Sequence, residues 1–124
     1  MSYLVKHYMD KEVPTTESHV SVLEGAKLMT NIKRGFLIIV KDGHPIGIVT
    51  EQDLVRKVIA AELNPSKLSL GEIMSSPLIT IDPDEDLVKA SELMKTNSIR
   101  RLPVIKDGVM YGVLTSREIS QRFV

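Results

Sequence analysis

The stretch FLIIVKDGHPIGIVT, residues 36–50, recurs as RLPVIKDGVMYGVLT at residues 101–115, and this recurrence decides the fold. The shared Lys-Asp-Gly tripeptides, 41–43 and 106–108, lie 65 residues apart. Further identical pairs follow the same offset without a gap: Met9/Met74, Thr15/Thr80, Leu28/Leu93, Met29/Met94, Leu37/Leu102, Gly47/Gly112 and Thr50/Thr115. The chain is therefore interpreted as a tandem repeat.

Each repeat predicts the element order β-α-β-β-α. In the first repeat we expect strands at Val13–Thr15, Phe36–Lys41 and His44–Thr50, and helices at Ser21–Asn31 and Glu51–Ala61. In the second, we expect helices at about Asp86–Thr96 and at Ser116–Val124. Ser21 and Glu24 have the spacing of a capping box. Asp42-Gly43 between two apolar runs is typical of a type I′ hairpin turn, because glycine tolerates positive φ.

The composition indicates one folded module and excludes several functions. The 124 residues carry 16 basic and 16 acidic side chains, which argues against a nucleic-acid partner bound through net charge. The absence of cysteine excludes disulfides, thiolate catalysis and cysteine-ligated zinc. The three histidines match no metal motif, so no metal site is predicted. Apolar runs are too short to cross a membrane, and the N-terminal sequence has no signal-peptide pattern, so a soluble, cytoplasmic protein is expected.

Each repeat is too small to bury a sufficient core by itself. We therefore expect an α/β (α+β) protein in which two repeats pack sheet to sheet with pseudo-two-fold symmetry. The first repeat spans residues 5–61, a linker spans 62–69 around Asn64-Pro65, and the second repeat spans 70–124. Asn-Pro favours a turn and ends a helix.

The ordered motifs resemble a pair of cystathionine-β-synthase (CBS) domains, also called a Bateman module. The resemblance rests on residues 5–9 and 70–74, on RLPVIKDG at 101–108, and on the endings GIVTEQD at 47–53 and GVLTSRE at 112–118. It covers nearly the whole chain and implies a stand-alone regulatory module that performs no catalysis. The implied ligand is adenosyl: AMP, ADP, ATP or S-adenosylmethionine.

The resemblance implies two clefts, each combining residues of both repeats. The preferred cleft contains Thr50, Asp53, Ile79, Ile99, Arg100 and Arg101. The second, weaker cleft contains Pro14, Arg34, Gly35, Phe36, Thr115 and Glu118. A carboxylate can accept the ribose hydroxyls, and a helix N-terminus or an arginine can bind phosphate. The extra methylene of Glu118, compared with Asp53, would push its carboxylate too far into the ribose pocket.

The same residues have structural interpretations. Thr-x-x-Asp at 50–53 and Thr-x-x-Glu at 115–118 are also capping-box patterns, as is Ser69 with Glu72. Arg100 and Arg101 could be a solvated pair of charges, and adjacent residues entering a strand point to opposite sides. The alternative function is a dimerisation or protein-interaction scaffold with empty clefts. No nucleophile–base pair or phosphate loop supports an enzyme.

A homodimer is expected, with an unknown regulated protein as a further partner. Leu54 and Val58, together with Ile119 and Phe123, are expected to form exposed apolar stripes on the closing helices. Such stripes on a folded chain mark an interface, and the family resemblance implies a two-fold dimer of four repeats.

Overall fold

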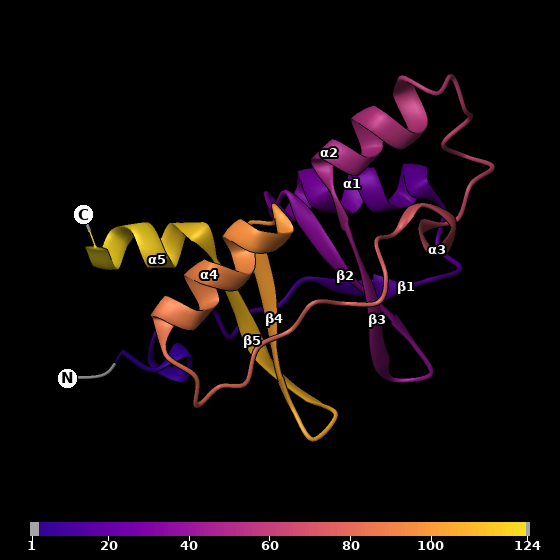
Figure 1. The fold of residues 1–124 in the computed structure, drawn as a ribbon. Helices are drawn as coiled ribbons and strands as arrows, with labels where there is room; N and C mark the ends of the chain where they lie inside the picture. Colours follow the sequence, from indigo (N-terminus) through magenta and orange to yellow (C-terminus); the bar gives the residue numbers. More distant parts are fainter. Residues whose placement is uncertain (1–2, 124) are drawn as a thin grey trace. The chain divides into compact units, whose positions relative to one another are not determined.

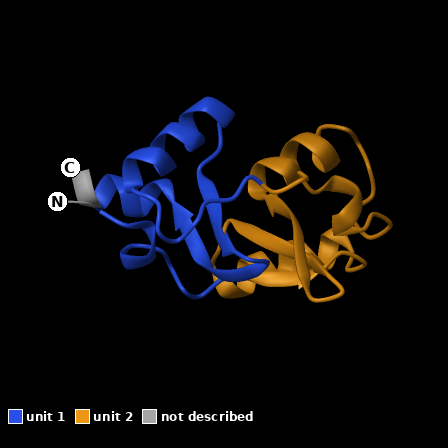
Figure 2. Ribbon diagram, turned by 60° about the horizontal axis from the view of Figure 1, so that its bottom comes forward, with its two compact units in different colours: residues 1–13, 79–124 blue, residues 14–78 orange. Residues whose placement is uncertain are grey.

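The structure, a computed structural model, describes residues 3–123 and divides into two compact units (Figures 1 and 2). Unit 2 contains residues 14–78. Unit 1 contains the chain up to Val13 and again from Ile79 onward. The units therefore do not coincide with the sequence repeats. The first residues of repeat 1, up to Val13, belong to unit 1 with the hairpin of repeat 2. The first residues of repeat 2, up to Leu78, belong to unit 2 with the hairpin of repeat 1.

Unit 2 is a three-stranded sheet with helices packed against it. Its elements are β1 (Thr15–Glu17), α1 (Val22–Ile32), β2 (Phe36–Lys41), β3 (His44–Thr50), α2 (Glu51–Asp53), the π-helix η2 (Leu54–Ile59) and α3 (Leu70–Ile73). The strand order is β1-β2-β3, with β1 parallel and β3 antiparallel to the central β2. In Figure 1, α1 and α2 lie beside each other at one side of this sheet.

The core of unit 2 joins these helices to one face of the sheet. Its buried residues are Val22, Met29, Leu37, Ile39, Val49, Val58, Leu70 and Ile73. Leu37 and Ile39 alternate along β2 and so share a face, which is the face that α1 and η2 cover. The core is therefore aliphatic, apart from the thioether of Met29.

Unit 1 repeats this plan with a smaller sheet. Its elements are the 3₁₀ turn η1 (Val5–His7), α4 (Leu87–Asn97), β4 (Arg101–Lys106), β5 (Val109–Thr115) and α5 (Ser116–Phe123). β4 and β5 form an antiparallel hairpin. Its buried core consists of Val5, Ile81, Leu87, Ala90, Met94, Leu102, Val104 and Leu114.

The α+β class and the long elements predicted from the sequence are confirmed. β2 and β3 occupy their predicted bounds, and both hairpins turn at residues with positive φ: Asp42 at 51° and Gly43 at 78°, with Asp107 and Gly108 alike. Ser21 caps α1 by accepting the N–H of Glu24 at 3.1 Å. The capping box would also need the Glu24 carboxylate to accept the N–H of Ser21. Instead, that carboxylate forms an ion pair with Lys27 at 3.5 Å.

The first strand of the second repeat was predicted but does not form. Ile81 makes a single parallel bridge to Val104, bonding Pro103 O and Ile105 N at 3.0 Å. In the first repeat the ladder continues, because Ser18 N–H donates to Val40 O. The residue equivalent to Ser18 is Pro83, which has no N–H to donate. Proline therefore ends the ladder in unit 1, and the first strand of unit 2 lies at Thr15–Glu17 rather than Val13–Thr15.

The closing helix of the first repeat also differs from the prediction. It begins as α2 but continues as a π-helix, with Ala60 N–H donating to Val55 O and Leu63 N–H to Val58 O. The apolar residues of this helix are not exposed as expected. Val58 is buried in the core and Leu54 is half-buried. The exposed apolar residues of this helix are Val55 and Ile59, at 59% and 66% exposure.

The expected apolar stripe is therefore wrong at Leu54 and Val58. Residues 54, 55, 58 and 59 are all apolar, so the helix carries two adjacent stripes, and the sequence does not distinguish the buried one from the exposed one. In unit 1, Ile119 is half-buried against the core rather than exposed. The side chain of Phe123 lies outside the described residues.

A matched contact places the first residues of each repeat against the other repeat's hairpin. Met74 packs on Gly47 in unit 2, and Met9 packs on Gly112 in unit 1. A Cβ at either glycine would lie 3.0 Å or less from a Met Cγ. The two glycines and two methionines that mark the repeat in the sequence thus form the same contact twice.

An ion-pair cluster ties the N-terminal segment to β4 in unit 1. The two carboxylate oxygens of Asp84 accept hydrogen bonds from the ammonium groups of Lys6 and Lys106, each with an N···O distance of 2.9 Å. The hydrogen bond from Lys106, followed by that from Lys6, lowers the pKa of Asp84 from 3.8 to about 2. The same bond raises the pKa of Lys106.

Asp84→Asn is expected to remove a pH-dependent part of the stability. Because the folded-state pKa is depressed, the stabilising contribution is present above about pH 4 and is lost as the pH falls toward 2. Urea unfolding of wild type and variant should therefore differ at pH 6 and converge near pH 2. The control Asp42→Asn changes a carboxylate in an exposed hairpin turn. If the free energy of unfolding of the wild type exceeds that of Asp84→Asn by the same amount from pH 6 to pH 2, the assignment is wrong.

Candidate functional site

The Thr-x-x-Asp motif lies where β3 passes into α2, in unit 2. Thr50 is the N-cap, and its hydroxyl accepts the N–H of Asp53 at 3.3 Å. In return Asp53 Oδ2 accepts the N–H of Thr50 at 2.8 Å and the Thr50 hydroxyl at 3.3 Å. The capping box predicted from the sequence is confirmed. The role of these residues in binding a ligand stays a prediction.

The Asp53 carboxylate is largely shielded, with 14% of its side chain exposed. Its other oxygen, Oδ1, forms an ion pair with the ammonium group of Lys57, at 3.2 Å. A carboxylate oxygen has two acceptor positions. Oδ2 is therefore saturated by Thr50, whereas Oδ1 keeps one acceptor position beyond the Lys57 contact.

The corresponding motif in unit 1 is arranged differently. Glu118 Oε1 accepts the N–H of Thr115 at 2.9 Å, and its Oε2 accepts the Thr115 hydroxyl at 2.7 Å. The longer side chain thus uses both oxygens on one residue and holds the Thr115 hydroxyl by a short, charge-assisted bond. The Thr50 hydroxyl, at 3.3 Å from Asp53, is held less tightly.

Unit 2 brings together the Thr-x-x-Asp motif and four residues of the second predicted cleft. Phe36 pairs with Thr50 across the sheet, and Gly35 O accepts the N–H of Glu51 at 3.0 Å. Pro14 O accepts the N–H of Ile38, at the edge of β1. The guanidinium of Arg34 lies 5.2 Å from the centre of the Phe36 ring, a cation–π contact.

Unit 1 brings together Thr115 and Glu118 with the four remaining residues of the preferred cleft. Arg101 pairs with Thr115 across the hairpin, and Arg100 O accepts the N–H of Ser116 at 2.8 Å. Arg100 is exposed and Arg101 half-buried. Ile79 is 37% exposed, whereas Ile99 packs against the core of the unit. Each predicted cleft thus combines residues that belong to both units.

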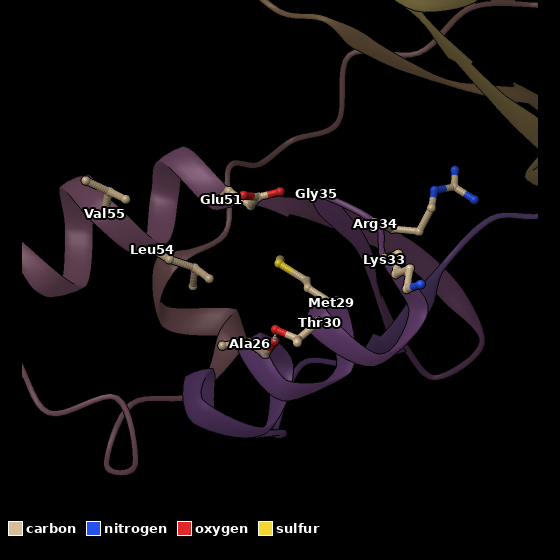
Figure 3. A pocket seen from close by; sticks show the side chains of 9 residues that line it. All are labelled: Ala26, Met29, Thr30, Lys33, Arg34, Gly35, Glu51, Leu54 and Val55. Carbon is tan, nitrogen blue, oxygen red and sulfur yellow. Dashed lines mark hydrogen bonds between the residues drawn. The ribbon is translucent and has the colours of Figure 1, made fainter.

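A hollow of about 440 Å³ lies between α1 and the α2–η2 helix of unit 2 (Figure 3). It is lined by Ala26, Met29, Thr30, Lys33, Arg34, Gly35, Glu51, Leu54 and Val55. In Figure 3 the Arg34 side chain points away from the hollow, while Met29 and Leu54 point into it. Thr50 and Asp53 do not line this hollow. The Thr-x-x-Asp motif therefore does not form the hollow, but the hollow shares Arg34 and Gly35 with the second predicted cleft and is also lined by the exposed residue Val55.

Lys57 is a partner of Asp53 that the sequence analysis missed. Besides this ion pair, its ammonium group donates to Ile73 O at 2.8 Å. The signal was present in the sequence, because an acidic residue four positions before a lysine on a helix is a favourable pair.

Among residues 3–123, no group of three histidine or acidic side chains is placed to hold a metal ion. Within the same residues, the helices are too short or too polar to cross a membrane.

Comparison with known proteins agrees with the internal repeat. The sequence model of the CBS domain matches residues 5–60 and 70–124. An uncharacterized protein of Methanopyrus kandleri, MK0525, is 37% identical over 113 residues, which cover 90% of this chain and 58% of that protein. The chain spans little more than half the length of this relative and of the mitochondrial CBSX3 protein of Arabidopsis thaliana, 58% and 53%.

Two solved structures are similar over nearly the whole chain. The CBS domain pair of protein MJ0100, in complex with 5′-methylthioadenosine and S-adenosyl-L-methionine, has a TM-score of 0.89 at 31% identity and covers 99% of this chain and 97% of its own. A hexameric CBS-CP12 protein from bloom-forming cyanobacteria has a TM-score of 0.90 at 30% identity, covering 99% and 73%. The chain belongs to the CBS domain family and carries two CBS domains.

Proposed function

We propose that the chain is a regulatory module that binds an adenosyl ligand between its two CBS domains, without catalysis. The observation that carries the proposal is the shielded Asp53 carboxylate beside a helix N-terminus, with one acceptor position left on Oδ1. The MJ0100 domain pair, which resembles this chain over nearly its full length, was solved with two adenosyl compounds. The ligand class is therefore S-adenosylmethionine, AMP, ADP or ATP.

In this proposal the cap and the ligand site are the same residues used in two ways. Asp53 keeps the N–H of Thr50 and accepts a ribose hydroxyl at Oδ1. The long Thr50 hydroxyl bond frees that hydroxyl to turn toward the ligand, since the N–H bond alone keeps the carboxylate in place. Ile79 and Ile99 would line the base, and Arg100 or Arg101 would meet phosphate or the ligand's carboxylate. In the second cleft, the short Thr115–Glu118 bond opposes the same rearrangement.

A panel of AMP, ADP, ATP, S-adenosylmethionine and NAD, tested by thermal shift and calorimetry, examines this function. At a ligand concentration 100 times Kd, the expected stabilisation is about 2.7 kcal/mol. NAD is the comparison compound for the preference for a single adenosyl unit. If none of the five stabilises the chain, the proposal is wrong and the ligand-free interaction scaffold takes its place.

We also propose that two chains associate through the exposed apolar residues beside the hollow of unit 2. Val55 and Ile59 lie four positions apart on one helix, and Ile32 at the end of α1 is 40% exposed. Apolar side chains exposed together mark interfaces, and the CBS-CP12 relative is a hexamer. The occupant proposed is a second copy of the chain.

Ile59→Lys is expected to convert the dimer to a monomer at micromolar concentration, because it places a charge in the apolar centre of the interface. Light scattering coupled to gel filtration measures the mass directly. Val109→Lys, at the start of β5 in unit 1 and 52% exposed in the wild type, is the matched control and should stay dimeric. A wild-type monomer with and without ligand, or an Ile59→Lys dimer, would contradict this interface.

A further inference from the structure

Lys57 connects the Asp53 carboxylate to a distant part of unit 2. Its ammonium group lies 3.2 Å from Asp53 Oδ1, 2.8 Å from Ile73 O and 3.5 Å from Ser75 Oγ. Ile73 is the last residue of α3, and carbonyls at a helix end have no partner within the helix. A single ammonium group thus pairs with the proposed ribose acceptor and donates a hydrogen bond to the end of α3.

The segment that Lys57 holds leads out of unit 2. Ser75 is paired with Ile48 of β3 through two backbone bonds, of 2.9 and 3.1 Å. The chain leaves unit 2 after Leu78. The next residue is Ile79, which is among the expected base contacts. Lys57 therefore contacts both Asp53 and the segment that continues along the chain toward Ile79.

We propose that Lys57 is a positioning residue that couples Asp53 to the segment Ile73–Ser75, an inference that rests on the proposed function for its consequence. The ammonium fixes the direction of Oδ1 through the ion pair and donates hydrogen bonds to Ile73 O and Ser75 Oγ. A ribose hydroxyl that donates to the remaining acceptor position of Oδ1 binds beside Lys57, to a carboxylate that Lys57 already holds in place. By linkage, ligand binding at Asp53 and the ordering of Ile73–Ser75 favour each other by the same factor.

The ligand-free part of the test uses backbone amide hydrogen exchange at Ser75. Four proteins are compared: wild type, Asp53→Asn, Lys57→Met and the double variant. Asn keeps an acceptor for the Thr50 N–H, so the cap is largely retained. If the coupling exists, Asp53→Asn changes exchange at Ser75 by about threefold or more in the wild-type background and by less in the Lys57→Met background, as a double-mutant cycle requires. An equal effect in both backgrounds overturns the coupling.

The ligand part uses calorimetry with the panel compound that binds wild type best. Lys57→Met is expected to weaken binding about threefold to tenfold, the range for losing a partly exposed ion pair with a charged hydrogen bond. Lys57→Arg, which keeps the charge and the donors, should restore most of the affinity. Lys27→Met removes an ion-paired lysine on α1 of unit 2, which pairs with Glu24 at 3.5 Å, and should leave the affinity unchanged. Unchanged affinity in Lys57→Met overturns the role in binding.

The two parts separate this inference from the proposed function. If wild type binds no compound of the panel, the proposed function fails, and the exchange cycle alone decides the coupling of Asp53 to Ser75. If wild type binds but the exchange effects of Asp53→Asn are equal in both backgrounds, the adenosyl site stands and Lys57 is only a surface contact of the helix.

Discussion

Asp53→Ala should weaken binding of the best adenosyl ligand by at least about tenfold, because a charge-assisted hydrogen bond contributes roughly 1.5–3 kcal/mol. Asp53 offers the ribose a shielded oxygen with a free acceptor position, and no other group in the motif replaces it. Isothermal calorimetry with the purified variant measures the change. Glu118→Ala should change the affinity much less, since the second cleft is the weaker one.

Glu118→Ala is also the control for helix capping. Each variant removes a carboxylate that accepts the N–H of a capping threonine, Thr50 at 2.8 Å or Thr115 at 2.9 Å. Both should therefore lose roughly 0.5–2 kcal/mol of stability in urea unfolding. Equal losses of stability with full ligand affinity in both would mean that Thr50 and Asp53 form a cap and nothing more. A loss of binding confined to Glu118→Ala would place the ligand in the other cleft.

Gly112→Ala should destabilise the fold by about 1–3 kcal/mol, the usual cost of overpacking a tight contact. An added Cβ would lie 2.7 Å from the backbone oxygen of Asp10. That oxygen cannot withdraw easily, because Asp10 and Val113 exchange two backbone bonds of 2.8 and 2.9 Å. Urea unfolding monitored by circular dichroism measures the loss.

Gly47→Ala is the matched control, since it occupies the same position in the first repeat. The nearest atoms to its added Cβ belong to the Met74 side chain, which has rotatable bonds and can move aside. We expect a smaller loss of stability than for Gly112→Ala. A loss as large at Gly47 would show that the methionine contact, rather than the Asp10 backbone, limits the space.

The sequence predicts the hairpins of this fold well, because their signals are local. Alternating apolar residues and an Asp-Gly turn determine β2 and β3 within the chain segment itself. The same holds for the cap of α1 at Ser21 and for the capping box of Thr50 and Asp53. These features depend on residues three or four positions apart, and a single sequence displays them directly.

Features that depend on a distant partner were predicted less well. The missing strand at Ile81 follows from Pro83, but its effect is visible only once the ladder partner, Ile105, is known. The π-helix escapes prediction because apolar residues at 54, 55, 58 and 59 suit either helix type. The same pattern leaves open which stripe is buried, so the exposed residues proved to be Val55 and Ile59.

For the candidate site, the sequence predicted the motif but not the hydrogen bonds and ion pairs that its side chains make. The Thr-x-x-Asp motif identifies a helix start, yet its sequence does not reveal that one Asp53 oxygen is saturated by Thr50. Nor does it reveal that Lys57 reaches Ile73, because that residue belongs to the next repeat and joins unit 2 only in the folded chain. Contacts between segments far apart in the sequence are what the structure adds.

The most direct measurement of the central claim is a crystal structure of the chain with the best-binding compound of the adenosyl panel. The account predicts the ribose hydroxyls within hydrogen-bond distance of the Asp53 carboxylate, with Arg100 or Arg101 contacting the polar end of the same ligand molecule. A ligand bound at Glu118 with Asp53 still engaged only by Thr50 and Lys57, or a ligand bound in the hollow beside Val55, would contradict it.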